Sequence, residues 1–314
     1  MGTPARDSYD VVIVGGAIMG SAVAWFLTDL GFDGRVLVVD RDLSFENTAT
    51  ATSTSCIRQQ FSTELNVRIS QFGAEFINDL RGFMGGDPRV PQLGIRNFGY
   101  LYLADTDAFA DDLRARAAVQ QAAGAATRLL SRDQIARLYP FYALDDIVLG
   151  SINTRDEGYF DSMAVFEWLR RQAQERGVEY LEAEVVGMDV LAGRVQSVRL
   201  ASGERIACGQ VVNAAGPRAE HVARFAGIDL PVEPRKRYTF IFSAQTPLDR
   251  DLPLTIDPSG VHMRSEGKYY LAGCPPDDDP AVEFDDFVQD HSIWEEKVWP
   301  TLANRVPAFE FLLS

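Results

Sequence analysis

The chain has 314 residues, 46% of them hydrophobic and 24% charged, and its formal net charge at pH 7 is −15. Such a composition is typical of a globular protein and excludes a disordered chain, and the length allows about two domains with a large core. The negative charge disfavours nucleic acid and anionic membrane surfaces as partners.

The sequence gives no indication of a membrane-spanning segment, a metal site or disulfide bonds. No apolar run approaches the roughly 18 residues that a membrane span needs, and residues 1–7 lack the apolar core of a signal peptide. We therefore expect a cytoplasmic protein with no transmembrane segment. Cys56, Cys208 and Cys274 are far apart, which argues against disulfides and, together with three scattered histidines, against a metal site.

The N-terminal residues predict a βαβ dinucleotide site. An apolar strand at 9–14 runs into a glycine-rich turn at 15–20, an apolar helix follows as far as Leu30, and a second strand at 35–39 ends on Asp40. In such a unit the first glycine permits a tight turn, the last lets the helix pack close to the strand, and the N–H groups at the helix end face a pyrophosphate. Asp40 is spaced to accept hydrogen bonds from the adenosine ribose.

The turn departs from the usual Gly-x-Gly-x-x-Gly pattern at its middle position, which is Ala17. A methyl group therefore stands where the backbone approaches the phosphates. A glycine-rich turn alone is weak support, but the flanking strand and helix and the spaced Asp40 favour dinucleotide binding. The alternative is an ordinary tight turn in an α/β sheet.

The chain is less regular after this unit. Residues 47–56 are small and polar and predict a loop. A helix follows, with Ser62 as its N-cap. Its apolar face is predicted from helical spacing to consist of Leu65, Ile69, Phe72, Phe76, Leu80 and Phe83. We then expect a strand at 99–104, a helix near 107–123 and a short helix after Ser131.

A second strand-to-helix junction lies in the middle of the chain. We expect a helix from Asp161 to Gly177, with Val165, Phe166, Leu169 and Ala173 buried, and strands at 178–190, 194–200, 204–208 and 210–213. The last strand breaks into Ala214-Ala215-Gly216 before another helix. Two such junctions suggest that separated segments form one sheet. Alternation at 238–242 predicts an antiparallel second domain.

Residues 12–16 and 211–216 together resemble the glycine/D-amino-acid oxidase superfamily of FAD enzymes, which includes sarcosine oxidase and dimethylglycine dehydrogenase. A narrower resemblance is to the FAD-dependent oxidoreductase-domain proteins of mitochondrial complex I assembly and their bacterial relatives. It rests on residues 57–62, 231–238, 297–300 and 305–310, which spread over nearly the whole chain.

The resemblance implies an α/β fold, α+β overall, in which a Rossmann-like FAD-binding domain is joined by a discontinuous second domain built on an antiparallel sheet. We expect residues 1–88 and 155–228 to form the FAD-binding domain, and residues 89–154 and 229–314 to form the substrate domain.

The resemblance also implies the residues that bind FAD. The pyrophosphate would be held by Gly15, Gly16, Ala17, Met19 and Gly20, and the adenosine end by Asp40, Arg41 and the backbone of Val185. The path of the flavin would be lined by Ser53, Thr54, Ser55 and Cys56, and the cofactor would be covered by Ala214, Ala215 and Gly216. Relatives with covalent flavin place a histidine near Thr54, but none stands there, so we expect non-covalent FAD.

A site that oxidises a secondary amine needs a cation for the substrate carboxylate. Arg58 is the first candidate, because a guanidinium can bind a carboxylate bidentately; a surface or loop ion pair is the alternative. Gln59 would hydrogen-bond the flavin or cap the next helix. Lys236 and Tyr238 would share one face of a strand and line the pocket, unless that strand is a solvated basic edge.

We therefore expect an FAD-dependent oxidoreductase that transfers hydride from the α-carbon of a small secondary or N-methylated amino acid to flavin N5. The acceptor stays open between oxygen, a quinone and an electron-transfer protein. One alternative is a flavoprotein that serves the assembly of a respiratory complex with little turnover. Another is a truncated remnant with weak FAD binding, because the family pattern continues beyond 309–310 into a strand and a glycine-rich loop, whereas the chain ends at Ser314.

Overall fold

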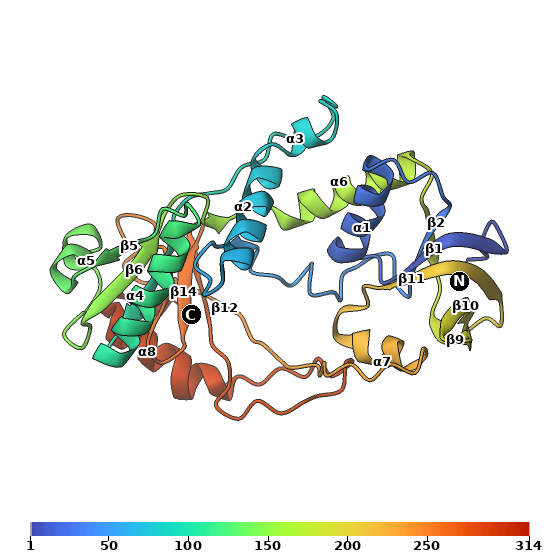
Figure 1. Cartoon of the computed structure of the whole chain (residues 1–314). Coiled ribbons are helices and arrows are strands. Elements are labelled where there is room, and N and C mark those ends of the chain that lie inside the picture. Colours follow the sequence, from blue (N-terminus) through green and yellow to red (C-terminus); the bar gives the residue numbers. More distant parts are fainter. Residues whose placement is uncertain (1, 314) are drawn as a thin grey trace. The chain divides into compact units, whose positions relative to one another are not determined.

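The computed structural model describes residues 2–313 and contains two compact units (Figure 1). The first comprises the chain up to Ser53 with residues 161–235 and 281–286, and the second comprises residues 54–160, 236–280 and the chain from 287. Residues 54–88 were assigned above to the FAD-binding domain, but they lie in the second compact unit. Which segments form each functional domain stays a prediction.

The first unit is built on a six-stranded sheet with the order β8-β2-β1-β11-β10-β9. Its strands are β1 (Ser8–Val14), β2 (Val36–Asp40), β8 (Glu179–Glu182), β9 (Val185–Leu191), β10 (Arg194–Leu200) and β11 (Arg205–Asn213). The pairs β8–β2, β2–β1 and β1–β11 are parallel, and β9 and β10 extend the sheet in antiparallel fashion. In β1, Val11 to Val14 are all buried, as is typical of a strand covered on both faces.

The predicted βαβ unit is confirmed. Helix α1 (Ile18–Asp29) joins β1 to β2 and packs against α6 (Ser162–Glu175). The side chain of Asp161 caps α6 by accepting a hydrogen bond from Ala164 N at 2.9 Å. The four residues predicted to face the core from α6 are all buried. A short 3₁₀ helix (Gly216–Arg218) and α7 (Ala219–Arg224) follow β11.

Two strand predictions in this unit were wrong. Residues 178–190 form two strands, because β8 pairs with β2 whereas β9 pairs with β10. Residues 204–213 contain one strand, not two, and Gly209 lies inside it. A Cβ at Gly209 would stand 2.9 Å from the carbonyl oxygen of Asp10, so the glycine permits the close approach of β1.

The second unit is built on an eight-stranded sheet with the order β16-β12-β15-β14-β13-β4-β6-β5. Its strands are β4 (Tyr100–Ala104), β5 (Arg128–Leu130), β6 (Leu149–Asn153), β12 (Phe240–Ala244), β13 (Leu254–Ile256), β14 (His262–Glu266), β15 (Tyr269–Gly273) and β16 (Leu312–Leu313). All neighbours are antiparallel except β13 and β4, so the predicted antiparallel domain is in fact a mixed sheet.

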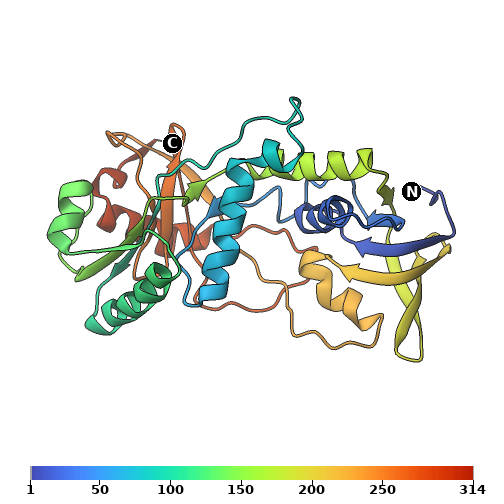
Figure 2. The ribbon, with the colours of Figure 1, turned by 45° about the horizontal axis from the view of Figure 1, so that its top comes forward.

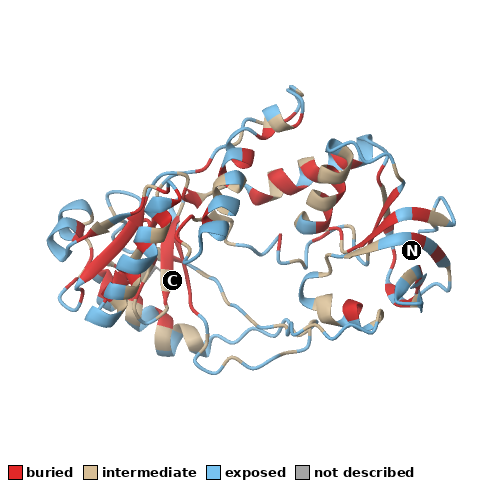
Figure 3. Cartoon of the chain, in the orientation of Figure 1, coloured by how far each residue is buried: buried red, intermediate tan, exposed pale blue. Residues whose placement is uncertain are grey.

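Helices and a small ribbon complete the second unit. These elements are β3 (Cys56–Ile57) paired with β7 (Gly158–Tyr159), and α2 (Glu64–Asn78), α3 (Leu80–Phe83), α4 (Asp107–Ala122), α5 (Arg132–Leu138), a π-helical turn (Trp294–Val298), α8 (Trp299–Arg305) and a 3₁₀ turn (Pro307–Phe309). Most residues of the central strands β4, β6, β14 and β15 are buried (Figure 3). The α/β fold with an antiparallel component, expected from the sequence, is confirmed.

The helix after the polar loop differs from its prediction. It begins after Thr63, not Ser62, and a break at Asp79 separates α2 from α3, where the Asp79 side chain accepts from Gly82 N at 3.2 Å. The predicted apolar face is also wrong in its first half. Leu65 is 68% exposed and Ile69 59% exposed, whereas Val67 is fully buried.

This difference gives a stability prediction. Val67→Ala should lower the free energy of unfolding by about 1–2 kcal/mol, because it leaves a cavity in a packed site. Leu65→Ala should change it by less than about 0.5 kcal/mol, since that side chain gains little from burial. Urea unfolding of both variants tests this. Equal losses in the two variants would contradict the observed orientation of α2.

Within residues 2–313, no helix combines the length and the apolar character that a bilayer crossing requires. The same residues contain no group of three or more histidine, cysteine or acidic side chains placed to hold a metal ion. The three cysteines are free thiols.

Candidate functional site

The turn between β1 and α1 can be built only with glycine at two positions. Gly15 has φ +99°, and a Cβ there would lie 2.3 Å from the carbonyl oxygen of Ala214. A Cβ at Gly20 would lie 1.8 Å from the carbonyl oxygen of Gly15. The first glycine therefore lets a second segment approach, and the last brings the helix against the turn, as the pattern predicts.

The two strand-to-helix junctions lie side by side. Strands β1 and β11 pair in parallel with Val14 opposite Asn213, and the N–H of Ala214 donates to the carbonyl oxygen of Val14 at 2.8 Å. Both views of the ribbon show the two strands as neighbours that end together (Figures 1 and 2). Both junctions therefore stand at the carboxyl edge of the parallel part of one sheet, where α/β proteins bind nucleotides.

Asn213 shapes the second junction. Its Oδ1 accepts from Ala215 N at 3.2 Å, and its Nδ2 donates to the carbonyl oxygen of Ala219 at 2.6 Å. Gly216 has φ +57°, and a Cβ added there would meet nothing within 4 Å. Residues 214–216 thus bring only small side chains to the end of β11.

Asp40 ties the end of β2 to the glycine-rich turn. Its Oδ2 accepts from the backbone N–H of Gly16 at 2.7 Å, and its Oδ1 accepts from Asp42 N at 3.1 Å. The carboxylate therefore lies at the edge where the sequence predicts the ribose of a dinucleotide. The predicted spacing between the glycine-rich turn and Asp40 thus corresponds to a direct hydrogen bond between Gly16 and Asp40.

The N-terminal end of α1 suits an anion. Ala17 is the N-cap and provides no side-chain hydrogen bond, and the first turn contains no acidic residue. Thr50 Oγ1 accepts from Ile18 N at 3.3 Å. The first turn of this 12-residue helix thus carries no acidic side chain of its own, and its backbone N–H donors fit a pyrophosphate. Met19 is 67% exposed, so its side chain is not part of the packed turn.

A second arginine, not predicted from the sequence, accompanies the adenosine-end residues. Burial and then the neighbouring charge of Arg41 lower the pKa of Arg218, while the carboxylates of Asp285 and Glu184 oppose this shift. The guanidinium of Arg218 lies 3.9 Å from the ring centre of Phe284. Val185, predicted to contact adenine, is buried at the start of β9. Arg41, predicted at the adenosine end, therefore lies near enough to Arg218 to act on its charge.

Hydrogen bonds hold the backbone of the loop residues Thr54 and Ser55, just before β3. The carbonyl oxygen of Thr54 accepts from Arg264 Nη2 at 3.0 Å and from Cys56 Sγ at 3.3 Å. Ser55 has φ +52°, and its carbonyl oxygen accepts from Phe160 N at 3.0 Å. Burial raises the pKa of the Cys56 thiol, which therefore stays protonated and unreactive at neutral pH.

Arg58 is a cation that packs against two aromatic rings. Its guanidinium lies 4.8 Å from the ring centre of Phe61 and 6.0 Å from that of Tyr100. Its Nε is buried and has no hydrogen-bond partner within residues 2–313, which also contain no ion pair to this side chain. The aromatic rings thus hold a guanidinium that retains hydrogen-bonding capacity for a ligand.

The side chain of Gln59, a predicted site residue, forms hydrogen bonds to other residues of the chain. The side chain is 2% exposed, its Nε2 donates to the carbonyl oxygen of Arg155 at 3.3 Å, and its Oε1 accepts from Gln71 at 3.3 Å. It does not cap α2, whose N-cap is Thr63, so the alternative of helix capping was wrong. The contacts give Gln59 a structural place next to Arg58.

Sequence reasoning missed Glu157, the most unusual acid in the chain. Glu157 is fully buried, and its carboxylate accepts from Gln59 N at 2.7 Å, Asn153 Nδ2 at 2.8 Å and Gln60 Nε2 at 3.0 Å. Burial raises the pKa of Glu157 to about 7, although these hydrogen bonds and Arg58 act in the opposite direction.

Glu157 makes the stability of the fold depend on pH with a defined sign. A carboxyl whose pKa in the folded state lies above its ordinary value of 4.5 stabilises the fold when protonated, so stability falls as the pH rises from 4.5 through about 7. Glu157→Gln should reduce the loss of unfolding free energy over this pH range by roughly 2–3 kcal/mol. Urea unfolding between about pH 5 and pH 8 measures it, and parallel wild-type and variant profiles would contradict it.

The strand predicted to carry Lys236 and Tyr238 was wrong at that place, because β12 begins only at Phe240. Lys236 Nζ donates to the carbonyl oxygen of Val288 at 2.9 Å, and Arg237 forms two hydrogen bonds to Asp279 at 2.7 and 2.8 Å. The carbonyl oxygen of Tyr238 approaches Gly273, where a Cβ would stand 2.4 Å away. Lys236 and Arg237 thus bind Val288 and Asp279 outside the sheet.

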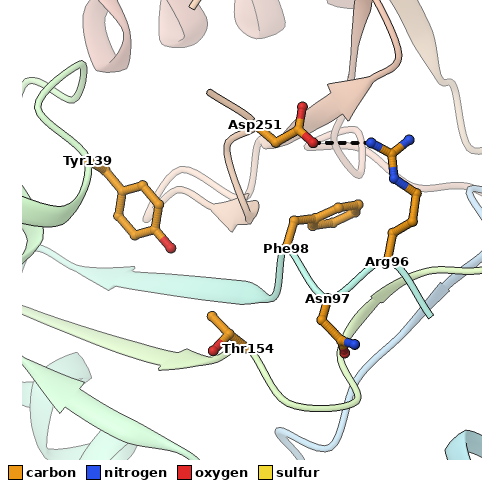
Figure 4. A pocket seen from close by; sticks show the side chains of 6 residues that line it. All are labelled: Arg96, Asn97, Phe98, Tyr139, Thr154 and Asp251. Atoms are coloured by element: carbon orange, nitrogen blue, oxygen red, sulfur yellow. Dashed lines mark hydrogen bonds and ion pairs between the residues drawn. The ribbon is translucent and has the colours of Figure 1, made fainter. Parts of the chain in front are cut away.

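A separate hollow of about 450 Å³ in the second unit is lined by Arg96, Asn97, Phe98, Tyr139, Thr154 and Asp251 (Figure 4). Its two charged groups satisfy each other, since Arg96 Nη2 lies 3.2 Å from Asp251 Oδ2. The hollow therefore offers a ligand no uncompensated charge.

The chain matches known proteins along almost its whole length. A sequence profile of the FAD dependent oxidoreductase (DAO) family matches residues 10–312. FAD-dependent oxidoreductase domain-containing protein 1 of Bos taurus is 33% identical over 339 aligned residues, covering 96% of this chain and 69% of the bovine protein. Sarcosine oxidase subunit beta of Rhizobium meliloti is 27% identical, covering 85% of this chain and 61% of that protein.

Solved structures share the fold at low identity. L-Proline dehydrogenase from P. horikoshii superposes with a TM-score of 0.80 at 22% identity, covering 98% of this chain and 80% of that one. Glycine oxidase from Geobacillus kaustophilus gives a TM-score of 0.78 at 20% identity, covering 98% and 81%. With the glycine-rich turn, the acid after β2 and the paired second junction, these matches show that the chain belongs to the FAD dependent oxidoreductase family.

Proposed function

We propose that this protein is a flavoenzyme that oxidises a small secondary or N-methylated amino acid with non-covalently bound FAD. The observation that carries the proposal is the guanidinium of Arg58, which lies against two aromatic rings and has a buried Nε without a hydrogen-bond partner within residues 2–313. Its relatives include a sarcosine oxidase subunit, and its structural neighbours include a proline dehydrogenase and a glycine oxidase.

The first unit would bind the dinucleotide part of the cofactor. The N–H groups at the start of α1 would face the pyrophosphate, and Asp40 would accept hydrogen bonds from the ribose. Gly15 and residues 214–216 would permit backbone approach, because these residues are small. The loop 53–56 would lead to the flavin.

FAD, when bound, supplies the hydride acceptor for oxidation of the α-carbon. The chain itself would bind and orient the amino acid. Arg58 would bind the carboxylate through two N–H groups, and the rings of Phe61 and Tyr100 would keep the guanidinium in place and exclude water from one side of it.

Spectroscopy with candidate substrates tests this proposal. Anaerobic addition of sarcosine, dimethylglycine or proline to the purified yellow protein should bleach the flavin band for at least one of them. Bleaching that fails for all three and for a wider panel of secondary amines would contradict amine oxidation.

A second candidate function is a flavoprotein that assists assembly of a respiratory complex with little turnover. Its support is the resemblance, stated above, to the FAD-dependent oxidoreductase-domain proteins of complex I assembly. The chain is 33% identical to FAD-dependent oxidoreductase domain-containing protein 1 of Bos taurus and 27% identical to the sarcosine oxidase subunit. Affinity capture that recovers respiratory-complex subunits, from a protein whose flavin no amine bleaches, would favour this function over the first.

A further inference from the structure

We propose that Glu157 is a positioning residue that holds Arg58 for a carboxylate ligand and makes the affinity of that site depend on pH. The inference rests on the proposed function, in which Arg58 binds the substrate carboxylate.

Glu157 fixes the backbone that carries Arg58. Its Oε1 accepts from the N–H of Gln59, the residue after Arg58, at 2.7 Å, and its Oε2 accepts from Gln60 Nε2 at 3.0 Å. The same Gln60 nitrogen donates to the carbonyl oxygen of Tyr100 at 3.0 Å, and the ring of Tyr100 lies beneath the guanidinium. Carboxylate, segment and aromatic ring thus form one connected network.

Glu157 is also the buried charge that acts on Arg58. Its hydrogen-bond donors are neutral amides, and the charged or titratable groups that influence it are Arg58 and the phenol of Tyr102. Burial raises the pKa of Tyr102, which therefore stays neutral. On the turn of Glu157 itself, Arg155 donates to the carbonyl oxygen of Gly124 and Asp156 accepts from Asn78.

This arrangement couples the protonation of Glu157 to the binding of a carboxylate at Arg58. A carboxylate bound to Arg58 and an ionised Glu157 are like charges close to one guanidinium, so each disfavours the other. Since the pKa of Glu157 is about 7, carboxylate binding near neutral pH should be accompanied by uptake of part of a proton. The site should therefore bind carboxylates more tightly below pH 7 than above it.

Calorimetric titration of the FAD-loaded protein with pyrrole-2-carboxylate, whose carboxyl is ionised throughout this pH range, tests the inference. We expect the wild-type Kd to rise roughly threefold to tenfold between about pH 6 and pH 8. At pH 7 the binding enthalpy should vary with the ionisation enthalpy of the buffer. Glu157→Gln should abolish both effects, and the adjacent control Asp156→Asn should keep both.

The outcomes separate the inference from the proposed function. A Glu157→Gln profile that retains the wild-type pH step would overturn the role of Glu157. Should that variant fail to fold, a wild-type Kd that is constant from about pH 6 to pH 8, without proton uptake, would overturn it equally. Equal binding by wild type and Arg58→Gln would instead overturn the Arg58 site, and with it both proposals.

Discussion

Replacing Gly15 by alanine is expected to weaken FAD binding severely. The new Cβ would lie 2.3 Å from the carbonyl oxygen of Ala214, a backbone atom that cannot rotate away, and the position has φ +99°. The ends of β1 and β11 would have to separate by about an ångström, and displacements of this size cost about 100-fold where atoms must be positioned for a ligand. We expect the Kd for FAD to rise at least roughly 100-fold.

Gly31→Ala is the matched control for this change. Gly31 also has a positive φ, +84°, but a Cβ there would meet nothing within 4 Å. This variant should lose about 1 kcal/mol of stability from backbone strain and keep its FAD. Fluorescence titration of the apoproteins compares the two affinities. A Gly15→Ala protein that binds FAD as tightly as Gly31→Ala would contradict the fitted junction.

Removing the guanidinium of Arg58 is expected to have the second large effect. Arg58→Met keeps an apolar stem between Phe61 and Tyr100 but removes the charge and both donor edges. Binding of a carboxylate should weaken roughly 10- to 100-fold, because a hydrogen bond to a charged group contributes about 1.5–3 kcal/mol. The loss should appear in the KM of an amino-acid substrate or the Kd of a carboxylate inhibitor.

Two further variants make this prediction specific. Arg58→Lys should restore little, since a single ammonium lacks the planar fork that binds both carboxylate oxygens. Arg155→Met changes an arginine on a neighbouring turn that contacts the carbonyl oxygen of Gly124, and it should shift affinity less than about twofold. If Arg155→Met weakens binding as much as Arg58→Met, the effect is general electrostatics and not a site.

The first βαβ unit and α6 could be predicted because their signals are local. The turn 15–20, Asp40 and the Asp161 cap each act on a neighbouring element, and the structure has all three contacts. The pairing of β1 with β11 is long-range. It was nevertheless expected, because two similar junctions of apolar strand and small residues occur in one chain.

Other features depend on partners that the sequence does not reveal. The division of 178–190 into two strands follows from different neighbours, β2 and β10. Lys236 and Arg237 lie outside a strand because Val288 and Asp279, more than forty residues later, hold them. Half-exposed residues such as Leu65 and Ile69 show that helical spacing alone does not identify the face that packs.

Glu157 could not be recognised from its surroundings in the sequence. It stands beside Asp156 in a polar turn before Gly158, and nothing local separates the two acids. Only the tertiary fold brings Gln59, Gln60 and Asn153 around one of them and leaves the other part-exposed. The buried carboxyl of Glu157 is hydrogen-bonded to Gln59, the residue after Arg58.

The central claim is that the glycine-rich turn and the Asn213 junction bind one dinucleotide together. Mass spectrometry of the small molecules released when the purified protein is heated measures this directly. The account predicts FAD, in an amount equal to that of the chain, and much less after Gly15→Ala. A folded wild-type protein that releases no flavin, and takes up none when FAD is added, would contradict it.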